Sequence, residues 1–146
     1  MLYLFDLDDT LIRGYLSHPD QDFNACEPLP GRRDRLAELL HAGHDVAIIS
    51  NQRSVAFGFV SDTEVWAKLR CAGAVLGLPE DVPLYVCMHD VRGRWPWNDV
   101  AQAARAKPSG AMLKEAMRDL ESGPQITRMI GDRPEDQQAA TAQATQ

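Results

Sequence analysis

Short apolar runs alternate along this chain with segments in which apolar residues recur at helical spacing. The runs predict buried strands, and the helically spaced segments predict helices that pack one face against a sheet. The predicted strands cover 2–7, 45–49, 82–88 and 126–130, and the predicted helices cover 31–42, 61–76, 109–120 and 134–144. Because strands alternate with helices, we expect an α/β fold with a doubly wound, Rossmann-like parallel sheet and flanking helices.

Local signals refine the helices. Ser61 and Glu64 have the spacing of a capping box, which marks the start of the helix 61–76. Ser109 precedes the next helical segment and is expected to cap it. On the first of these two helices, the buried face is expected to carry Val65, Trp66, Leu69 and Leu76.

The length of 146 residues predicts one domain that spans 1–146 and buries a substantial core. Two stretches interrupt the alternation of strands and helices, and both are too short to form a large cap domain. We expect 11–29 to form a small flap insertion beside Asp8. The stretch 89–106 is expected to form a loop on the substrate side.

The charge and cysteine content of the chain bear on its binding partners and on where in the cell it works. The chain has 15 Lys and Arg against 21 Asp and Glu, a net charge of -6, which gives no general attraction to nucleic acid or anionic membranes. No apolar run approaches the roughly 18 residues of a membrane span, and no signal peptide is recognisable, so a cytoplasmic protein is expected. The three cysteines, Cys26, Cys71 and Cys87, are odd in number and widely spaced, which favours reduced thiols.

Polar residues follow several of the predicted strands. Asp6 and Asp8 lie two residues apart where the first strand ends, so their side chains share a face at the carboxyl edge of the sheet. Two carboxylates in one small space repel each other unless a divalent cation lies between them. Ser50, Lys107 and Asp132 also come at or near the ends of predicted elements. The pattern therefore predicts a metal-dependent site at this edge.

Four motifs give the chain a resemblance to a known superfamily. They are Asp6-x-Asp8-x-Thr10, the strand-end Ser50, Lys107 before Pro108, and Gly131-Asp132-x-x-x-Asp136. In this order they resemble the motifs of the haloacid dehalogenase (HAD) superfamily. The segments 28–32, 50–52 and 55–58 extend the resemblance to a branch without cap domains, which contains histidinol-phosphate, heptose-bisphosphate and polynucleotide 3'-phosphatases.

The resemblance implies an Mg²⁺-dependent phosphomonoester hydrolase that works through an aspartyl-phosphate intermediate. Asp6 would be the nucleophile, and Asp8 would protonate the leaving oxygen and then activate water. Ser50 would hydrogen-bond phosphoryl oxygens, and Lys107 would neutralise charge around the transferring group. The metal ligands would be Asp6, the Asp8 main-chain carbonyl and Asp132.

The remaining site candidates would support this centre or touch the substrate. Asp136 would orient a ligand water or Lys107, and Thr10 would order the loop after the first strand. The candidate substrate contacts are Asn51, Arg53 and Arg133.

Two departures from the branch bear on cofactors and stability. Several of its small-molecule phosphatases hold a structural zinc ion between a Cys-x-His pair and a second Cys-rich pair. Cys87 and His89 supply the first pair, but 101–106 contains no Cys or His, so zinc is not expected. Family members also continue after the last helix into a fifth strand, whereas this chain stops at Gln146. We expect the last family strand to be missing and one edge of the sheet to be exposed.

The substrate is expected to be a phosphorylated small molecule, either a phosphate ester or a nucleotide. The loop at 92–97 contains two arginines and two tryptophans that could stack on nucleic acid bases, which keeps a polynucleotide 3'-phosphatase as an alternative. Tryptophans that anchor the loop, together with the acidic net charge, make nucleic acid the less favoured partner. The oligomeric state is left open.

Two other classes of protein share parts of the pattern. A signalling receiver domain also combines acids, a Ser or Thr and a Lys around Mg²⁺, but its phosphorylated aspartate follows a later strand, where this chain offers only Asp90. The second class is a noncatalytic or truncated protein that binds phosphate or Mg²⁺. It is supported only by the missing strand, because all the motif residues are present.

Overall fold

A parallel four-stranded sheet in the order β3-β2-β1-β4 forms the centre of the computed structural model, which describes residues 1–15 and 22–144. The strands are β1 (Leu2–Phe5), β2 (Asp45–Asn51), β3 (Leu84–Cys87) and β4 (Thr127–Ile130). The chain builds the sheet outward from β1 to β3 and then returns to add β4 on the other side of β1. The strand order therefore reverses beside β1, which is where open α/β sheets bind ligands.

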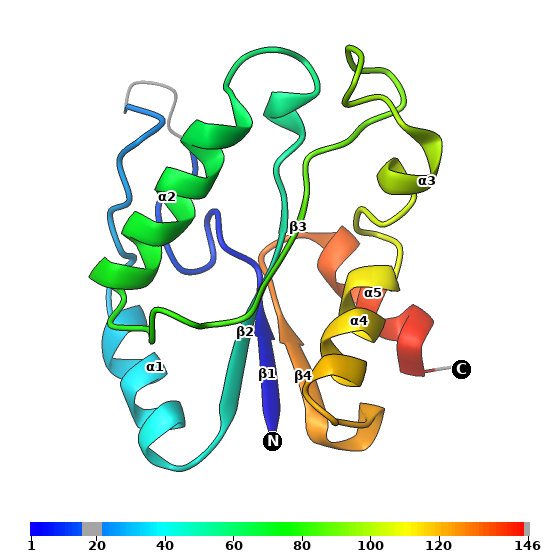
Figure 1. Cartoon of the computed structure of the whole chain (residues 1–146). Helices are drawn as coiled ribbons and strands as arrows, with labels where there is room; N and C mark the ends of the chain where they lie inside the picture. The colour runs from blue at the N-terminus through cyan, green and yellow to red at the C-terminus, as the bar shows by residue number, and fades with distance from the viewer. Residues whose placement is uncertain (16–21, 145–146) are drawn as a thin grey trace.

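Helices cover both faces of the sheet (Figure 1). On one face lie α1 (Arg32–His41) and α2 (Asp62–Val75), and on the other lie α4 (Ala111–Asp119) and α5 (Pro134–Ala144), with the short α3 (Val100–Ala103) at the carboxyl edge. Two clusters of buried apolar side chains correspond to the two faces. This arrangement confirms the predicted doubly wound α/β fold.

The two core clusters draw on alternate residues of the strands. Leu4 and Ile49 pack with the α4 side chains Met112 and Leu113. Phe5 belongs to the opposite cluster, with side chains of α1 and α2. Strands buried on both faces in this way are typical of parallel sheets, because helices cover each face.

Helix starts differ in how well the sequence predicted them. The capping box of Ser61 and Glu64 is present at the start of α2, as expected. Gly110 occupies the N-cap position of α4, one residue later than predicted, but the Ser109 hydroxyl accepts from the Ala111 backbone N–H over 3.2 Å and so still caps the helix start. The backbone N–H of Ser109 donates to the carbonyl of Ala106, so the hydroxyl reaches the helix from a turn that precedes it.

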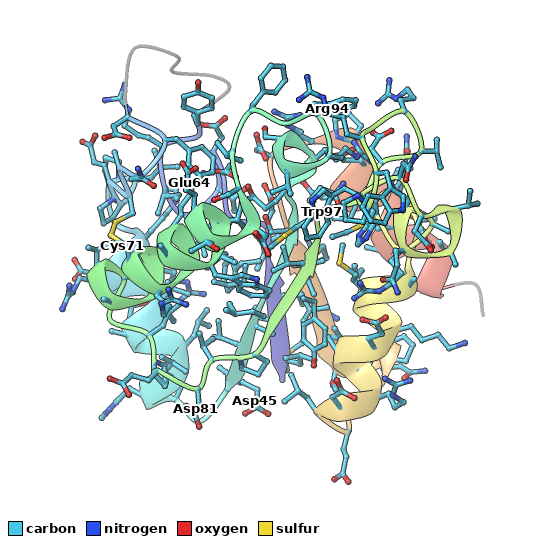
Figure 2. The ribbon with its side chains drawn as sticks, turned by 45° about the horizontal axis from the view of Figure 1, so that its top comes forward. Asp45, Glu64, Cys71, Asp81, Arg94 and Trp97 are labelled. Atoms are coloured by element: carbon cyan, nitrogen blue, oxygen red, sulfur yellow. A yellow bond between two sulfur atoms is a disulfide. The ribbon has the colours of Figure 1, made fainter. Side chains whose placement is uncertain are left out.

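A disulfide joins Cys26 to Cys71 across 45 residues, so the prediction of reduced thiols is wrong for this pair (Figure 2). Cys87 is a free, buried thiol. The count and spacing of the cysteines gave no sign that the segment around Cys26 returns to pack on α2. The bond ties the part of the predicted flap that the structure describes to that helix. The cytoplasmic location stays a prediction.

Reducing this disulfide should destabilise the fold. A cross-link that closes a loop of this length restricts the unfolded chain, and its loss is expected to lower the free energy of unfolding by about 3–4 kcal/mol. Melting curves with and without dithiothreitol measure the effect. The double variant Cys26→Ser/Cys71→Ser should melt like the reduced protein and ignore the reductant. An unchanged melting temperature in reduced wild-type protein would contradict the prediction.

Within 1–15 and 22–144, no helix has the length and apolar character needed to cross a membrane. The same part of the chain contains no large cap over the carboxyl edge of the sheet. Of the described strands, β4 pairs only with β1 and forms one edge of the sheet. Among the described residues, the β4 side of the sheet is therefore a lateral edge with no further strand.

Candidate active site

Strand register brings the predicted acids together at the carboxyl edge of the sheet. Phe5, the last residue of β1, pairs with Ile48 on one side and Ile130 on the other. The backbone N–H of Asp6 donates to the Ile130 carbonyl over 2.9 Å, so the pairing continues into the site. The loops that follow β1 and β4 therefore start side by side, which places Asp6 and Asp132 close together.

Three carboxyl groups form the centre of the site. Asp6, Asp132 and Asp136 each offer an oxygen, and these oxygens all lie within 4.8 Å of one another. The Thr10 hydroxyl lies 3.1 Å from Asp6 Oδ2 and 3.3 Å from Asp132 Oδ1, where it can donate to either. Thr10 therefore links the two acids that were predicted to be metal ligands.

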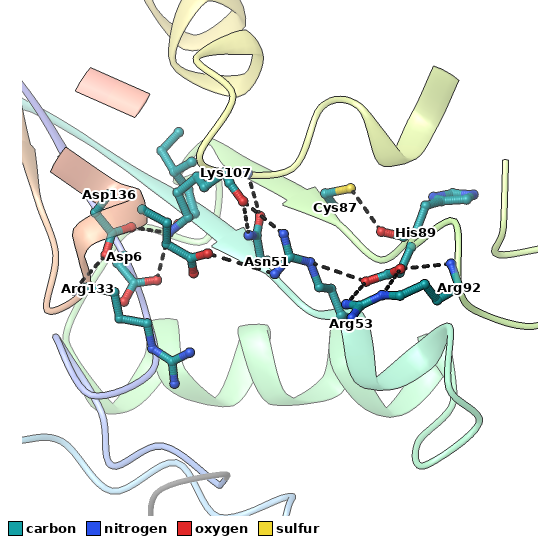
Figure 3. Close-up of polar contacts among 12 residues, drawn as sticks. Asp6, Asn51, Arg53, Cys87, His89, Arg92, Lys107, Arg133 and Asp136 are labelled. Atoms are coloured by element: carbon teal, nitrogen blue, oxygen red, sulfur yellow. Dashed lines mark hydrogen bonds and ion pairs between the residues drawn. The ribbon is translucent and has the colours of Figure 1, made fainter. Parts of the chain in front are cut away.

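Lys107 compensates part of this negative charge from the loop before α4 (Figure 3). Its side chain is 1% exposed, and its ammonium group donates to Asp6 Oδ1 over 3.0 Å and to the Ile49 carbonyl over 3.1 Å. A third, short contact joins it to Asp136 Oδ1. All three donors of the ammonium group are thus used, and Lys107 is fixed as a buried positive charge.

Gly131 and Arg133 make room for and hold the Asp136 carboxylate. A Cβ at Gly131 would collide with the Asp136 side chain, so only glycine allows this approach. The backbone N–H of Arg133 donates to Asp136 Oδ2 over 3.2 Å. Asp136 was predicted to orient either a ligand water or Lys107, and its contact with the Lys107 ammonium group favours the second role. The missing side chain of Gly131 thus makes room for this carboxylate.

Burial raises the pKa of Asp6 to about 7. This value already includes the Lys107 charge, which lowers the pKa, and the hydrogen bond with Asp132 and the negative charge of Asp136, which raise it. One ammonium group therefore does not balance the cluster, and a proton or another cation is needed to complete the charge. The available donors are carboxylate and carbonyl oxygens, which is the donor set that Mg²⁺ prefers. The residues present thus fit this ion.

The raised pKa of Asp6 predicts how Mg²⁺ should stabilise the protein at different pH. In the metal-free protein, the stability that comes from the Asp6 proton is complete below the ordinary pKa of 3.8 and is lost as the pH rises through about 7. Because a bound cation can replace this proton, we expect Mg²⁺ to raise the melting temperature more at pH 8 than at pH 5. Asp6→Asn should lose most of this difference. An Mg²⁺ effect that is independent of pH would contradict the prediction.

Ser50 and Asp8 are connected through a residue that the sequence analysis did not single out. Ser50 is buried and lies next to the last residue of β2, at the carboxyl end of the strand. The Gln52 side-chain amide donates to Ser50 Oγ and to Asp8 Oδ2, each over 2.8 Å. The predicted phosphoryl-binding hydroxyl and the predicted acid are therefore held by the same side chain.

Asn51 and Arg53 were candidates for substrate contacts, and the structure gives both a contact with the Lys107 backbone. The Asn51 side chain accepts from Lys107 N over 3.0 Å and donates to the Lys107 carbonyl over 2.9 Å. Arg53 donates to the same carbonyl over 2.9 Å. These two residues, which follow Ser50 closely in the sequence, thus fix the loop that presents the ammonium group.

Lys68 is the functional candidate that sequence reasoning missed. It lies on α2 and is 2% exposed, and its ammonium group is 2.7 Å from Asp8 Oδ1. Trp66, expected on the buried face of this helix, is instead exposed. A signal was present, since Lys68 comes three residues after Val65 and directly before Leu69, within the apolar stripe.

A cavity of about 310 Å³ opens above these groups. Acidic, basic and amide side chains of the site line it together with four aromatic side chains, Tyr15, Phe23, Phe57 and Phe59. Arg133 lines it as well, and Arg53 does so beside its contact with Lys107. The cavity thus combines phosphate-binding chemistry with apolar walls, as expected of a site for a small organic phosphate.

The loop at 92–97 contributes no residue to the lining of this cavity. Trp97 packs partly buried against the core and its ring lies 5.2 Å from that of His89, whereas Trp95 is 85% exposed. Hydrogen bonds from the Arg92 side chain and backbone lower the pKa of Asp90 to about 2. Trp97 therefore anchors the loop, and Asp90, the acid that a receiver domain would phosphorylate, is held by Arg92 (Figure 3).

Comparison with known proteins identifies relatives with this architecture. A family model described as polynucleotide kinase 3 phosphatase matches residues 1–142. The chain is 28% identical over 114 residues to the D-glycero-beta-D-manno-heptose-1,7-bisphosphate 7-phosphatase of Haemophilus influenzae, which covers 76% of this chain and 60% of the relative. The enzyme of the same name from Haemophilus ducreyi is 28% identical over 145 residues, with 92% and 74% coverage. The chain thus spans less than two thirds of the first relative's length.

Solved structures show the same fold. A HAD-like protein from Mesorhizobium loti superposes with a TM-score of 0.78 at 24% identity, covering 97% of this chain and 67% of the neighbour. The D,D-heptose 1.7-bisphosphate phosphatase of B. bronchiseptica, complexed with magnesium and phosphate, superposes with a TM-score of 0.73 at 25% identity, with 96% and 74% coverage. Because the family model spans nearly the whole chain, this protein belongs to the polynucleotide kinase 3 phosphatase family, within the HAD superfamily that its motifs resemble.

Proposed function

We propose that this chain is an Mg²⁺-dependent phosphomonoester hydrolase that passes the phosphoryl group through Asp6. The observation that carries the proposal is the buried Asp6 carboxyl group, held between Lys107 and Thr10 beside two further acids. Its position at the reversal of the strand order supports a ligand-binding role. Family membership and phosphatase relatives support the reaction class.

In the first step, an oxygen of Asp6 attacks the phosphorus atom, and the bond between phosphorus and the ester oxygen breaks. Asp8 gives its proton to the departing oxygen, so the alcohol leaves neutral and Asp8 becomes a carboxylate. Lys107 holds Asp6 in place and offsets the negative charge that approaches with the phosphoryl group. The product of this step is an aspartyl-phosphate.

In the second step, water attacks the phosphorus atom of the aspartyl-phosphate. The Asp8 carboxylate accepts the proton from this water, and the bond between Asp6 and phosphorus breaks. Inorganic phosphate leaves, Asp6 is again a carboxylate, and Asp8 carries the proton for the next cycle. Asp8 therefore serves both steps in opposite protonation states.

Asp6, Asp132 and the Asp8 main-chain carbonyl would hold Mg²⁺. When bound, this ion supplies positive charge to the phosphoryl oxygens and to the surrounding acids. Asp136 would support the site through Lys107, which it contacts directly. Ser50 would hydrogen-bond the phosphoryl group, and its link to Gln52 would fix the direction of its hydroxyl.

The proposed substrate class is a phosphorylated small molecule such as a sugar phosphate. A cavity of about 310 Å³ suits a compact ester, and the named activity of the relatives supports this class. A polynucleotide 3'-phosphatase is the second candidate, and the description of the family model supports it. The exposed Trp95 beside Arg94 would then contact the polynucleotide.

Phosphate release from a substrate panel tests the proposal. The panel includes sugar phosphates, nucleotides, histidinol phosphate and a 3'-phosphorylated oligonucleotide, each with Mg²⁺ and with EDTA. We expect Mg²⁺-dependent turnover, greatest for a small phosphate ester. A preference for the oligonucleotide that charge reversal at Arg92 and Arg94 removes would support the second candidate. A folded protein that turns over no ester and binds no Mg²⁺ would contradict both and favour a noncatalytic protein.

A further inference from the structure

The Asp8 carboxylate is held through both of its oxygens. The Lys68 ammonium group is 2.7 Å from Oδ1, and the Gln52 amide donates to Oδ2 over 2.8 Å. Both donors are buried, whereas the Asp8 side chain is 29% exposed and lines the cavity. The carboxyl group therefore faces the cavity while two side chains behind it fix its orientation.

Burying the charged Lys68 side chain at this position costs folding free energy. A buried ammonium group is unfavourable unless it is paired, and replacing a buried ion pair with apolar side chains is often neutral or stabilising. Among the described residues, its ammonium group contacts the Asp8 carboxylate and the face of the Phe23 ring, whose centroid is 4.6 Å from the ammonium nitrogen. Its neighbours Val65 and Leu69 are core side chains. Stability alone therefore does not account for a lysine here.

Both donors come from regular elements or their ends. Lys68 lies in the middle of α2, and Gln52 follows directly after β2 and is bonded to its Ser50. Side chains anchored on helices and strands hold a reacting group more precisely than loop residues do. By contrast, Asp8 itself lies in the loop after β1, so its orientation depends on these partners.

We propose that Lys68 and Gln52 are positioning residues that aim the Asp8 carboxyl group at the leaving-group oxygen. This inference rests on the proposed phosphatase function. In the protonated form, Oδ1 still accepts from Lys68, and the hydroxyl at Oδ2 can accept from Gln52 while it donates its proton to the ester oxygen. Proton transfer requires hydrogen-bond reach, and a displacement of about 1 Å can cost about 100-fold in rate. Esters with poor leaving groups should therefore depend on Lys68.

The leaving group provides the test. p-Nitrophenolate departs without protonation, whereas an alkoxide needs the proton from Asp8. The readout is kcat/KM, because it reports the steps up to departure of the leaving group and excludes hydrolysis of the intermediate. For Lys68→Met we expect about a 10- to 100-fold loss on the alkyl phosphate that wild-type protein prefers. The loss on p-nitrophenyl phosphate should be less than about threefold.

Matched variants separate charge and position from packing. Lys68→Arg keeps a cation and should recover part of the activity on the alkyl phosphate. Arg70→Met removes a cation from the exposed face of the same helix and should leave both substrates unaffected. Gln52→Leu also frees Ser50, so it should lower activity on both substrates but still cost more on the alkyl phosphate than on p-nitrophenyl phosphate, and it provides the test if Lys68→Met does not fold.

The outcomes distinguish this inference from the function on which it rests. Equal losses on both substrates would indicate a structural role for Lys68, and unchanged kinetics would indicate no role; either result would overturn the inference while the phosphatase function stands. A wild-type protein inactive on every ester would overturn the proposed function and, with it, the inference.

Discussion

Asp6→Asn is expected to reduce Mg²⁺-dependent phosphate release by about 10⁴-fold or more. The amide has nearly the shape of the carboxyl group, but its oxygen is a poor nucleophile and the lone pair of its nitrogen is delocalised into the carbonyl group. Phosphate release from the best substrate of the panel measures the effect. The amide oxygen can still accept from Lys107, and the amide NH2 can donate to the Thr10 hydroxyl, so the neighbouring groups can stay in place and the loss would reflect the chemistry.

The fold should tolerate this substitution. Burial raises the pKa of Asp6 to about 7, so the metal-free site already accommodates a neutral side chain at this position near neutral pH. The melting temperature without Mg²⁺ should therefore not fall. Asp9→Asn is the matched control, because Asp9 is a neighbouring acid that bonds the Gly14 backbone, and it should keep most of the activity. If Asp6→Asn retained activity within about tenfold of wild type, Asp6 would not be the nucleophile.

Lys107→Met is expected to lower both activity and stability. The ammonium group contacts Asp6 and Asp136 in a buried site, so its removal leaves two acids without their cation. Breaking a buried ion pair from one side typically costs about 3–5 kcal/mol of unfolding free energy, and loss of a charge that stabilises the transition state costs about 100- to 1000-fold in kcat. Urea denaturation and steady-state kinetics measure the two effects.

A second lysine nearby in the sequence provides a control for the buried position of Lys107. Lys114 lies exposed on α4, seven residues after Lys107, and Lys114→Met should change neither stability nor activity appreciably. A Lys107→Met protein that is as stable and active as wild type would show that the cluster does not need this cation. Normal stability combined with lost activity would assign Lys107 to catalysis alone.

The sequence predicted the fold and the acid cluster because both depend on local patterns read in order. Alternating strands and helices require a parallel sheet, and in such a sheet residues after β1 and β4 meet at one edge. Asp6 and Asp132 could therefore be paired without coordinates. Lys107 was predicted as a site residue from the order of the motifs, because its position before Pro108 does not by itself show what it contacts.

Contacts between distant segments were not predictable in this way. Lys68 lies on a helix whose buried face was predicted from apolar residues alone, and its partner Asp8 is 60 residues away in the sequence. The bond between Cys26 and Cys71 depends on how a loop returns to α2, which neither spacing nor count determines. In each case the residue can be read from the sequence, but its partner depends on which distant segment packs against it.

Covalent capture of the phosphoryl group tests the central claim most directly. Asp8→Asn should still transfer phosphate from p-nitrophenyl phosphate, whose leaving group needs no proton, but it should hydrolyse the intermediate slowly. We expect a burst of p-nitrophenolate equal to the protein concentration, and an acid-quenched protein that carries one phosphoryl group on the peptide containing Asp6. Phosphate release by wild-type protein, with no burst from Asp8→Asn and a phosphoryl group on another residue, would contradict the account.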